Sequence, residues 1–113
     1  MALLVAAVGF AQTNETKCDG TTYNMSVCLS AILKGVEADL IDVYQRALKT
    51  TDSRDLRNLK VAQSRWVAYR DADCKAEYEL FGRGSGRPNA FTACKVSLTR
   101  QRIADLVAAY GKK

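Results

Sequence analysis

Apolar residues recur every three to four positions in three segments of the chain, a spacing that places them on one face of an α-helix. The first segment runs from about Asn24 to Lys49, with Thr21 or Thr22 as the expected N-cap. Its apolar positions are Met25, Cys28, Leu29, Ile32, Val36, Leu40, Val43, Ala47 and Leu48. The pattern predicts a long amphipathic helix.

A second helix is expected from about Arg54 to Phe81, after a turn at residues 50–53 in which Asp52 or Ser53 caps it. It should stop at Gly82. The face that this spacing defines holds Leu56, Leu59, Gln63, Trp66, Arg70, Cys74, Glu77 and Phe81. Three of these side chains are polar, and polar groups must find partners where they are buried.

Residues 82–88 hold three glycines and a proline and predict the main loop. Asn89 is then the expected cap of a third helix that ends near Tyr110. The face of this helix holds Phe91, Cys94, Leu98, Arg102, Leu106 and Ala109. No strand-like alternation is visible, and the connections are short enough to favour antiparallel neighbours. The sequence predicts an all-α fold, a small up-down-up bundle of three antiparallel helices.

The N-terminal segment has the character of an export signal. An uncharged apolar run from Ala2 to Val8 is followed by Gly9-Phe10-Ala11, which has the small-x-small form of a cleavage site. We expect residues 1–11 to be a signal peptide, truncated at its start, and residues 12–113 to be one domain. The alternative is an ordinary buried segment. The run is much shorter than the roughly 20 residues that span a bilayer, so no transmembrane segment is expected.

Four cysteines, at positions 18, 28, 74 and 94, favour two disulfides in an exported domain. Cys74 and Cys94 lie at similar distances along neighbouring helices from the glycine-rich loop. This favours a Cys74–Cys94 bond and leaves Cys18 for Cys28. Positions about the first turn also allow Cys28–Cys74 with Cys18–Cys94, but we prefer the local pairs. A zinc site is the remaining alternative, although no C-x-x-C pair is present.

Charge is uneven along the chain, whose net charge is +5. Beyond residue 82, Asp105 is the only acidic residue. The basic residues there are Arg83, Arg87, Lys95, Arg100, Arg102, Lys112 and Lys113. This third of the chain is either plain solvated charge or a surface for an anionic partner such as membrane, cell-wall polymer or an acidic protein. Nucleic acid is not expected as a partner of an exported protein.

The side chains favour a binding protein over an enzyme. The chain has no histidine, the commonest general base and metal ligand. Paired cysteines leave no thiol nucleophile, and the glycine-rich loop lacks the Lys-Ser/Thr ending of a P-loop. We expect no catalysis, no cofactor and no metal.

A set of motifs makes the chain resemble a known family. Cys18 and Cys28 precede Asp39-x-x-Asp42-Val43-Tyr44. The run Gln63-x-x-Trp66-x-x-Tyr69-Arg70-Asp71-Ala72-x-Cys74 follows, and Cys94 precedes Leu98-Thr99-x-x-Arg102. This resembles the lysozyme-inhibitor LprI N-terminal domain family, small bacterial proteins that are exported to the periplasm or anchored as lipoproteins. Asp42 stands where the family often has asparagine. No lipobox cysteine follows the apolar run, which favours a soluble periplasmic form.

The resemblance implies a disulfide-bonded helical fold and, more weakly, lysozyme inhibition. The motif residues Asp39, Tyr44, Gln63, Trp66, Tyr69, Arg70, Asp71 and Arg102 are expected to be mainly structural. Trp66 should anchor the core. Arg70 should pair with Asp73, Glu77 or Asp39, and Arg102 should have a similar role.

If the chain has a binding surface, we expect it at the glycine-rich loop, through Arg83, Ser85 and Arg87. The alternative is that the loop is a plain solvated connector. The partner implied is lysozyme or another muramidase. Because animal lysozymes are strongly basic, the near-neutral first two helices would then have to form the contact. The alternatives are a module for an anionic envelope component and a structural or stress-related accessory protein.

Overall fold

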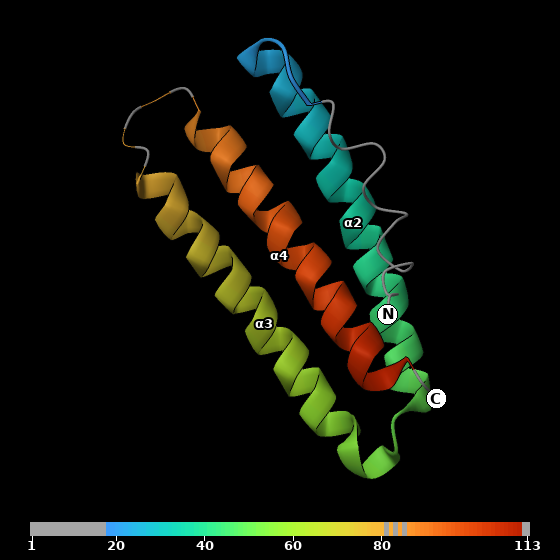
Figure 1. The fold of residues 1–113 in the computed structure, drawn as a ribbon. Helices are drawn as coiled ribbons and strands as arrows, with labels where there is room; N and C mark the ends of the chain where they lie inside the picture. The colour runs from blue at the N-terminus through green and yellow to red at the C-terminus, as the bar shows by residue number, and fades with distance from the viewer. Residues whose placement is uncertain (1–17, 81, 83, 85, 112–113) are drawn as a thin grey trace.

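The computed structural model describes residues 18–80, 82, 84 and 86–111, and the expected signal peptide therefore lies outside the described residues. Three helices form this part of the chain: α2 (Thr22–Thr50), α3 (Ser53–Leu80) and α4 (Arg87–Tyr110). They run antiparallel in sequence order, and α4 lies between α2 and α3 and packs against both (Figure 1). The prediction of an all-α, three-helix bundle is confirmed.

Side chains at both ends of α2 fix its length. The Oγ1 of Thr21 accepts a hydrogen bond from the Asn24 amide at 3.0 Å, so Thr21 is the N-cap. At the other end, the hydroxyls of Thr50 and Thr51 donate to the Ala47 carbonyl at 3.3 and 2.6 Å. These bonds satisfy a carbonyl group that the helix end leaves unpaired. The turn into α3 is therefore only two residues long, Thr51 and Asp52.

The connection from α3 to α4 contains a helix stop and one correction. Gly82 adopts φ 60°, the left-handed conformation that glycine tolerates, and its amide donates to the Glu79 carbonyl at 3.1 Å. The prediction that Asn89 caps α4 is wrong. The helix already begins at Arg87, because the fixed φ of Pro88 suits a first helical turn. The Asn89 side chain instead donates to the Thr22 carbonyl at 3.3 Å and joins the starts of α4 and α2.

The apolar core lies toward the α2–α3 turn. Its buried members are Leu40, Ala47, Leu59 and Leu106, with Val43, Tyr44, Leu48, Trp66, Ile103 and Tyr110 packed against them. Burying each large aliphatic side chain contributes roughly 1.5–3 kcal/mol. The predicted face of α4 omitted Val96 and Thr99, which are both buried. The predicted face was too narrow because α4, the central helix, contacts two neighbouring helices rather than one.

Both disulfides are local ones. Cys18 bonds to Cys28 and Cys74 bonds to Cys94, each with a Cα–Cα distance of 5.5 Å. The first joins the chain before α2 to the second turn of that helix, and the second joins α3 to α4. The preferred pairing is confirmed, whereas the rival pairing and the zinc site are wrong.

Candidate functional site

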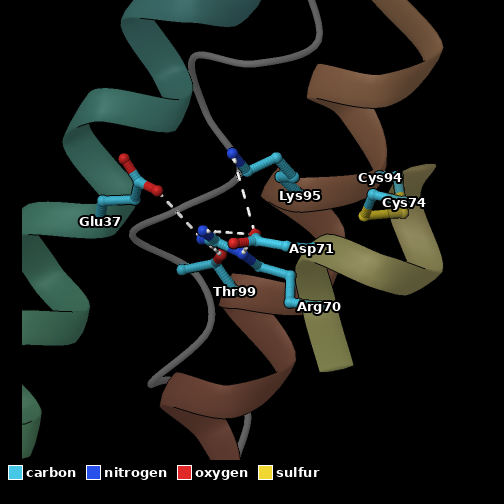
Figure 2. A network of polar contacts seen from close by, with 7 residues as sticks. All are labelled: Glu37, Arg70, Asp71, Cys74, Cys94, Lys95 and Thr99. Carbon is cyan, nitrogen blue, oxygen red and sulfur yellow. Dashed lines mark hydrogen bonds and ion pairs between the residues drawn. A yellow bond between two sulfur atoms is a disulfide. The ribbon is translucent and has the colours of Figure 1, made fainter. Parts of the chain in front are cut away.

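A buried guanidinium connects all three helices. Arg70, on α3, has a side chain only 8% exposed. Its Nη1 donates to the Oε2 of Glu37 on α2 at 2.9 Å and to the Oγ1 of Thr99 on α4 at 3.1 Å, and its Nε donates to the Oδ1 of Asp71 at 3.0 Å. Figure 2 shows the Arg70 side chain pointing between Glu37 and Thr99. Because a buried charge is costly unless it is paired and hydrogen-bonded, this geometry fixes how the helices sit beside one another.

The partners of Arg70 differ from those predicted. Helical spacing favoured Asp73, Glu77 and Asp39, but the carboxylates that reach the guanidinium are Glu37 and Asp71. Asp39 lies on α2 but is exposed, and two positions along the helix from Glu37 it points about 200° away from that residue. Asp71 also lies 4.0 Å from the Nζ of Lys95 on α4 (Figure 2).

Two arginine side chains lie close to the ring of Trp66. The Cζ of Arg70 is 5.5 Å from the ring centroid, and that of Arg102 is 6.0 Å away. Arg102 also donates from Nε to the Oε1 of the buried Gln63 at 2.9 Å. Cation–π attraction, hydrogen bonding and core packing thus act on the same stretch of the α3–α4 interface. These contacts support the predicted anchoring role of Trp66 and the internal role of Arg102.

The other motif residues divide between core and surface. Tyr44 packs against the apolar core. Asp39 is exposed on α2, and Tyr69 is 56% exposed on α3. The two exposed side chains take no part in the Arg70 network, so the motif does not converge on one surface.

Sequence reasoning did not assign roles to Glu37, Lys95 and Thr99, which complete the network. Thr99 is seven residues before the buried Leu106, a spacing that could have placed it on the inner face of α4. Glu37 follows the buried Val36, and its position gave no comparable signal. Glu37 reaches Arg70 because of the position at which α2 packs along its neighbours, and no sequence pattern indicates that position.

The predicted partner-binding loop is described only in part. Arg83 and Ser85 lie outside the described residues. Arg87 is half-buried, its Nε donates to the Tyr78 carbonyl at 3.2 Å, and its Cζ lies 4.1 Å from the Tyr78 ring centroid. Since the last carbonyls of α3 have no partner within the helix, Arg87 completes the end of that helix. Its Nε is therefore engaged within the protein.

One cluster has the residue types of a metal site. Ligand atoms of Asp73, Glu77 and Cys94 lie within 4.8 Å of one another. The Cys94 sulfur is bonded to Cys74, however, so it is not a thiolate. Two carboxylates remain, fewer than the three or four protein ligands of a typical zinc site.

Comparison with known proteins identifies the family. The model of the family described as Lysozyme inhibitor LprI matches residues 13–106. The chain belongs to this family. It is also similar to a protein of Rhizobium meliloti (strain 1021) named uncharacterized protein R02472, with 31% identity over 120 residues that cover 92% of this chain and 86% of the relative. No solved structure matches the chain.

Membership of the LprI family and two disulfides together favour an exported protein, because disulfides persist in oxidising compartments. Within the part of the chain that the structure describes, no helix combines the length and apolar character needed to cross a membrane.

Proposed function

We propose that this protein is an exported, non-catalytic inhibitor that binds lysozyme-type muramidases. The observation that carries the proposal is the match to the Lysozyme inhibitor LprI family over residues 13–106. The match includes all four cysteines and the residues of the Arg70 network. The domain would comprise residues 12–113 after removal of residues 1–11 and would work in the periplasm or outside the cell.

The chemistry of the chain supports inhibition by binding. It has no histidine, and all four cysteines are held in disulfides. The commonest general base and the strongest side-chain nucleophile are therefore missing. A protein that acts on an enzyme by occupying it needs neither group.

The fold also suits an inhibitor because it is rigid. Cys74–Cys94 joins α3 to α4, and the Arg70 network ties all three helices together at mid-length. A binding surface that is ordered beforehand loses less conformational entropy on association, which favours affinity. Preorganised inhibitors of hydrolases typically bind with little backbone movement.

The alternative function, binding an anionic envelope component, draws support from the basic charge beyond residue 82. Part of that charge is engaged internally in the described part of α4. Arg87 bonds to the Tyr78 carbonyl and Arg102 bonds to Gln63. Such engagement leaves less charge for a flat anionic surface, so we place this function second.

The test is lysis of a peptidoglycan suspension by a panel of animal and bacterial lysozymes. Oxidised mature protein should slow lysis in a dose-dependent way, and a reduced and alkylated sample should not. Unchanged lysis across the panel at micromolar excess would overturn the proposal. Binding to anionic vesicles or cell-wall polymer that collapses at high ionic strength would then favour the alternative.

A further inference from the structure

The α3–α4 hairpin carries a pocket at the end farthest from the α2–α3 turn. The pocket has a volume of about 440 Å³ and is lined by Asp71, Lys75, Tyr78, Phe91 and Lys95. We call it the tip pocket. Figure 1 shows this end of the hairpin, in yellow and orange, beside the start of α2, to which the Asn89–Thr22 hydrogen bond joins it.

Two aromatic rings form a fixed wall of the tip pocket. The rings of Tyr78 and Phe91 meet edge to face, with centroids 5.8 Å apart and an interplanar angle of 78°. Arg87 stacks on the Tyr78 ring, and the Nζ of Lys95 is 5.1 Å from the Phe91 centroid. The wall is therefore held in place from both sides.

The charge inside the tip pocket is positive. Two ammonium groups, of Lys75 and Lys95, face one carboxylate, that of Asp71. Asp71 is already engaged by Arg70 at 3.0 Å and lies 4.0 Å from Lys95. Lys75 is exposed and appears in none of the ion pairs of the described residues. The pocket therefore offers ammonium donors beside an apolar wall.

Two acidic side chains of the hairpin, those of Asp73 and Glu77, lie at a different groove. Glu77 lines that groove with Ala90, Ala93 and Cys94, and Asp73 lies close to Glu77. Asp73 and Lys75, two positions apart on one helix, point about 200° away from each other. The hairpin thus presents one cationic, aromatic side and one acidic side.

The disulfide fixes the spacing of the two lysines. Cys74 precedes Lys75 directly, and Cys94 precedes Lys95 directly. The bond holds the Cα atoms of the two cysteines 5.5 Å apart. The two ammonium-bearing positions therefore face a ligand at a set separation rather than as independent surface lysines.

An acidic side chain in partly apolar surroundings fits such a pocket. Glycoside hydrolases keep two carboxyl groups on either side of the bond they cleave, and in lysozyme one of them sits in a hydrophobic environment. We propose that the tip pocket receives a catalytic carboxylate of the muramidase, with this side of the hairpin covering the substrate cleft. This inference rests on the proposed function and identifies the surface that would perform it. Local attraction at the cleft would then offset the long-range repulsion between two basic proteins.

The test compares inhibition by matched double variants. Lys75→Ala/Lys95→Ala should raise the concentration for half-inhibition of an animal lysozyme about tenfold or more, because each lysine would be desolvated against a carboxylate. The control Lys34→Ala/Lys60→Ala removes the same charge from exposed positions on α2 and α3 and should stay within about twofold. Lys75→Glu, at an exposed position that cannot disturb the core, should weaken inhibition at least as strongly as the double variant.

A second measurement locates the contact on the enzyme. A soluble N-acetylglucosamine trimer in the lysozyme cleft should compete with the inhibitor, and a lysozyme whose catalytic glutamic acid is replaced by glutamine should bind it more weakly. The tip-pocket proposal is overturned if wild-type protein inhibits and Lys75→Ala/Lys95→Ala inhibits equally well. It is also overturned if the trimer does not compete. In both cases the proposed function stands. If wild-type protein binds no lysozyme of the panel, both proposals fail.

Discussion

Arg70 on α3 and Glu37 on α2 form an ion pair at 2.9 Å although α4 lies between the helices that carry them. The two side chains meet over Thr99, whose hydroxyl accepts a second bond from the same guanidinium nitrogen at 3.1 Å. One side chain thus sets the relative heights of three helices. The pair lies at mid-length, between the apolar core near the α2–α3 turn and the disulfide Cys74–Cys94.

The first prediction concerns this pair. Glu37→Gln should lower the free energy of unfolding by about 1–2 kcal/mol, because the buried guanidinium keeps only one of its two carboxylates. Asp42→Asn is the matched control, since Asp42 pairs with Arg46 on the exposed side of α2. It should cost less than about 0.5 kcal/mol. Urea denaturation of the oxidised proteins measures both, and equal losses would show that burial does not strengthen the Arg70–Glu37 pair.

The second prediction concerns Gln63, which holds Arg102 beside Trp66. Gln63→Ala should cost about 1–3 kcal/mol, because it leaves the Arg102 Nε without its acceptor and opens space in the helix interface. Trp66 is the only tryptophan, so intrinsic fluorescence reports directly on its surroundings. The emission should change in the folded variant. Gln45→Ala, at an exposed position of α2, should leave both stability and emission nearly unaltered.

The helices were predictable because their signal is local. Spacing of three and four, Thr21 as cap and Gly82 as stop placed α2 and α3 within a few residues of their observed bounds. Positions along the helices allowed two disulfide pairings, of which the preferred local one is observed. The start of α4 was missed because Asn89 was the predicted cap. Proline fits the first turn of a helix, so the helix begins before it, at Arg87.

The interhelical contacts were less predictable because they depend on register. Polar residues on a buried face indicated that Gln63 and Arg70 must have partners, and Arg102 was expected to be engaged internally. Glu37 lies 33 positions from Arg70. It can be recognised as the partner only when the position at which α2 packs along α4 is known. The tip pocket likewise combines positions of α3 and α4 that only the assembled hairpin brings together.

The third prediction is an order of reduction. Cys74 is fully buried and Cys94 is 7% exposed, whereas Cys18 and Cys28 are both only partly buried. Because thiol–disulfide exchange requires access to a sulfur, mild reductant should open Cys18–Cys28 first. Timed alkylation and mass spectrometry distinguish the two bonds. Simultaneous loss of both would mean that reduction proceeds through global unfolding.

Replacing each bond tests its contribution to stability. Cys74→Ala/Cys94→Ala should destabilise by about 3 kcal/mol or more, from the entropy of an open 20-residue loop together with the packing lost in the interface. Cys18→Ala/Cys28→Ala should cost less, because it frees only the segment before the second turn of α2. The reverse ranking, measured by urea denaturation, would contradict this assignment.

The last prediction concerns the end of α3. Arg87→Ala removes the donor to the Tyr78 carbonyl and the cation over the Tyr78 ring, so the last turn of α3 should open more readily. The loss of about 1 kcal/mol of local stability should speed hydrogen exchange of the amides of Glu79, Leu80 and Gly82 several-fold. Arg57→Ala, on the exposed side of the same helix, should leave these amides unaffected. If exchange is unchanged in Arg87→Ala, the arginine does not stabilise the helix end, and its charge is then available to a partner that binds at the loop.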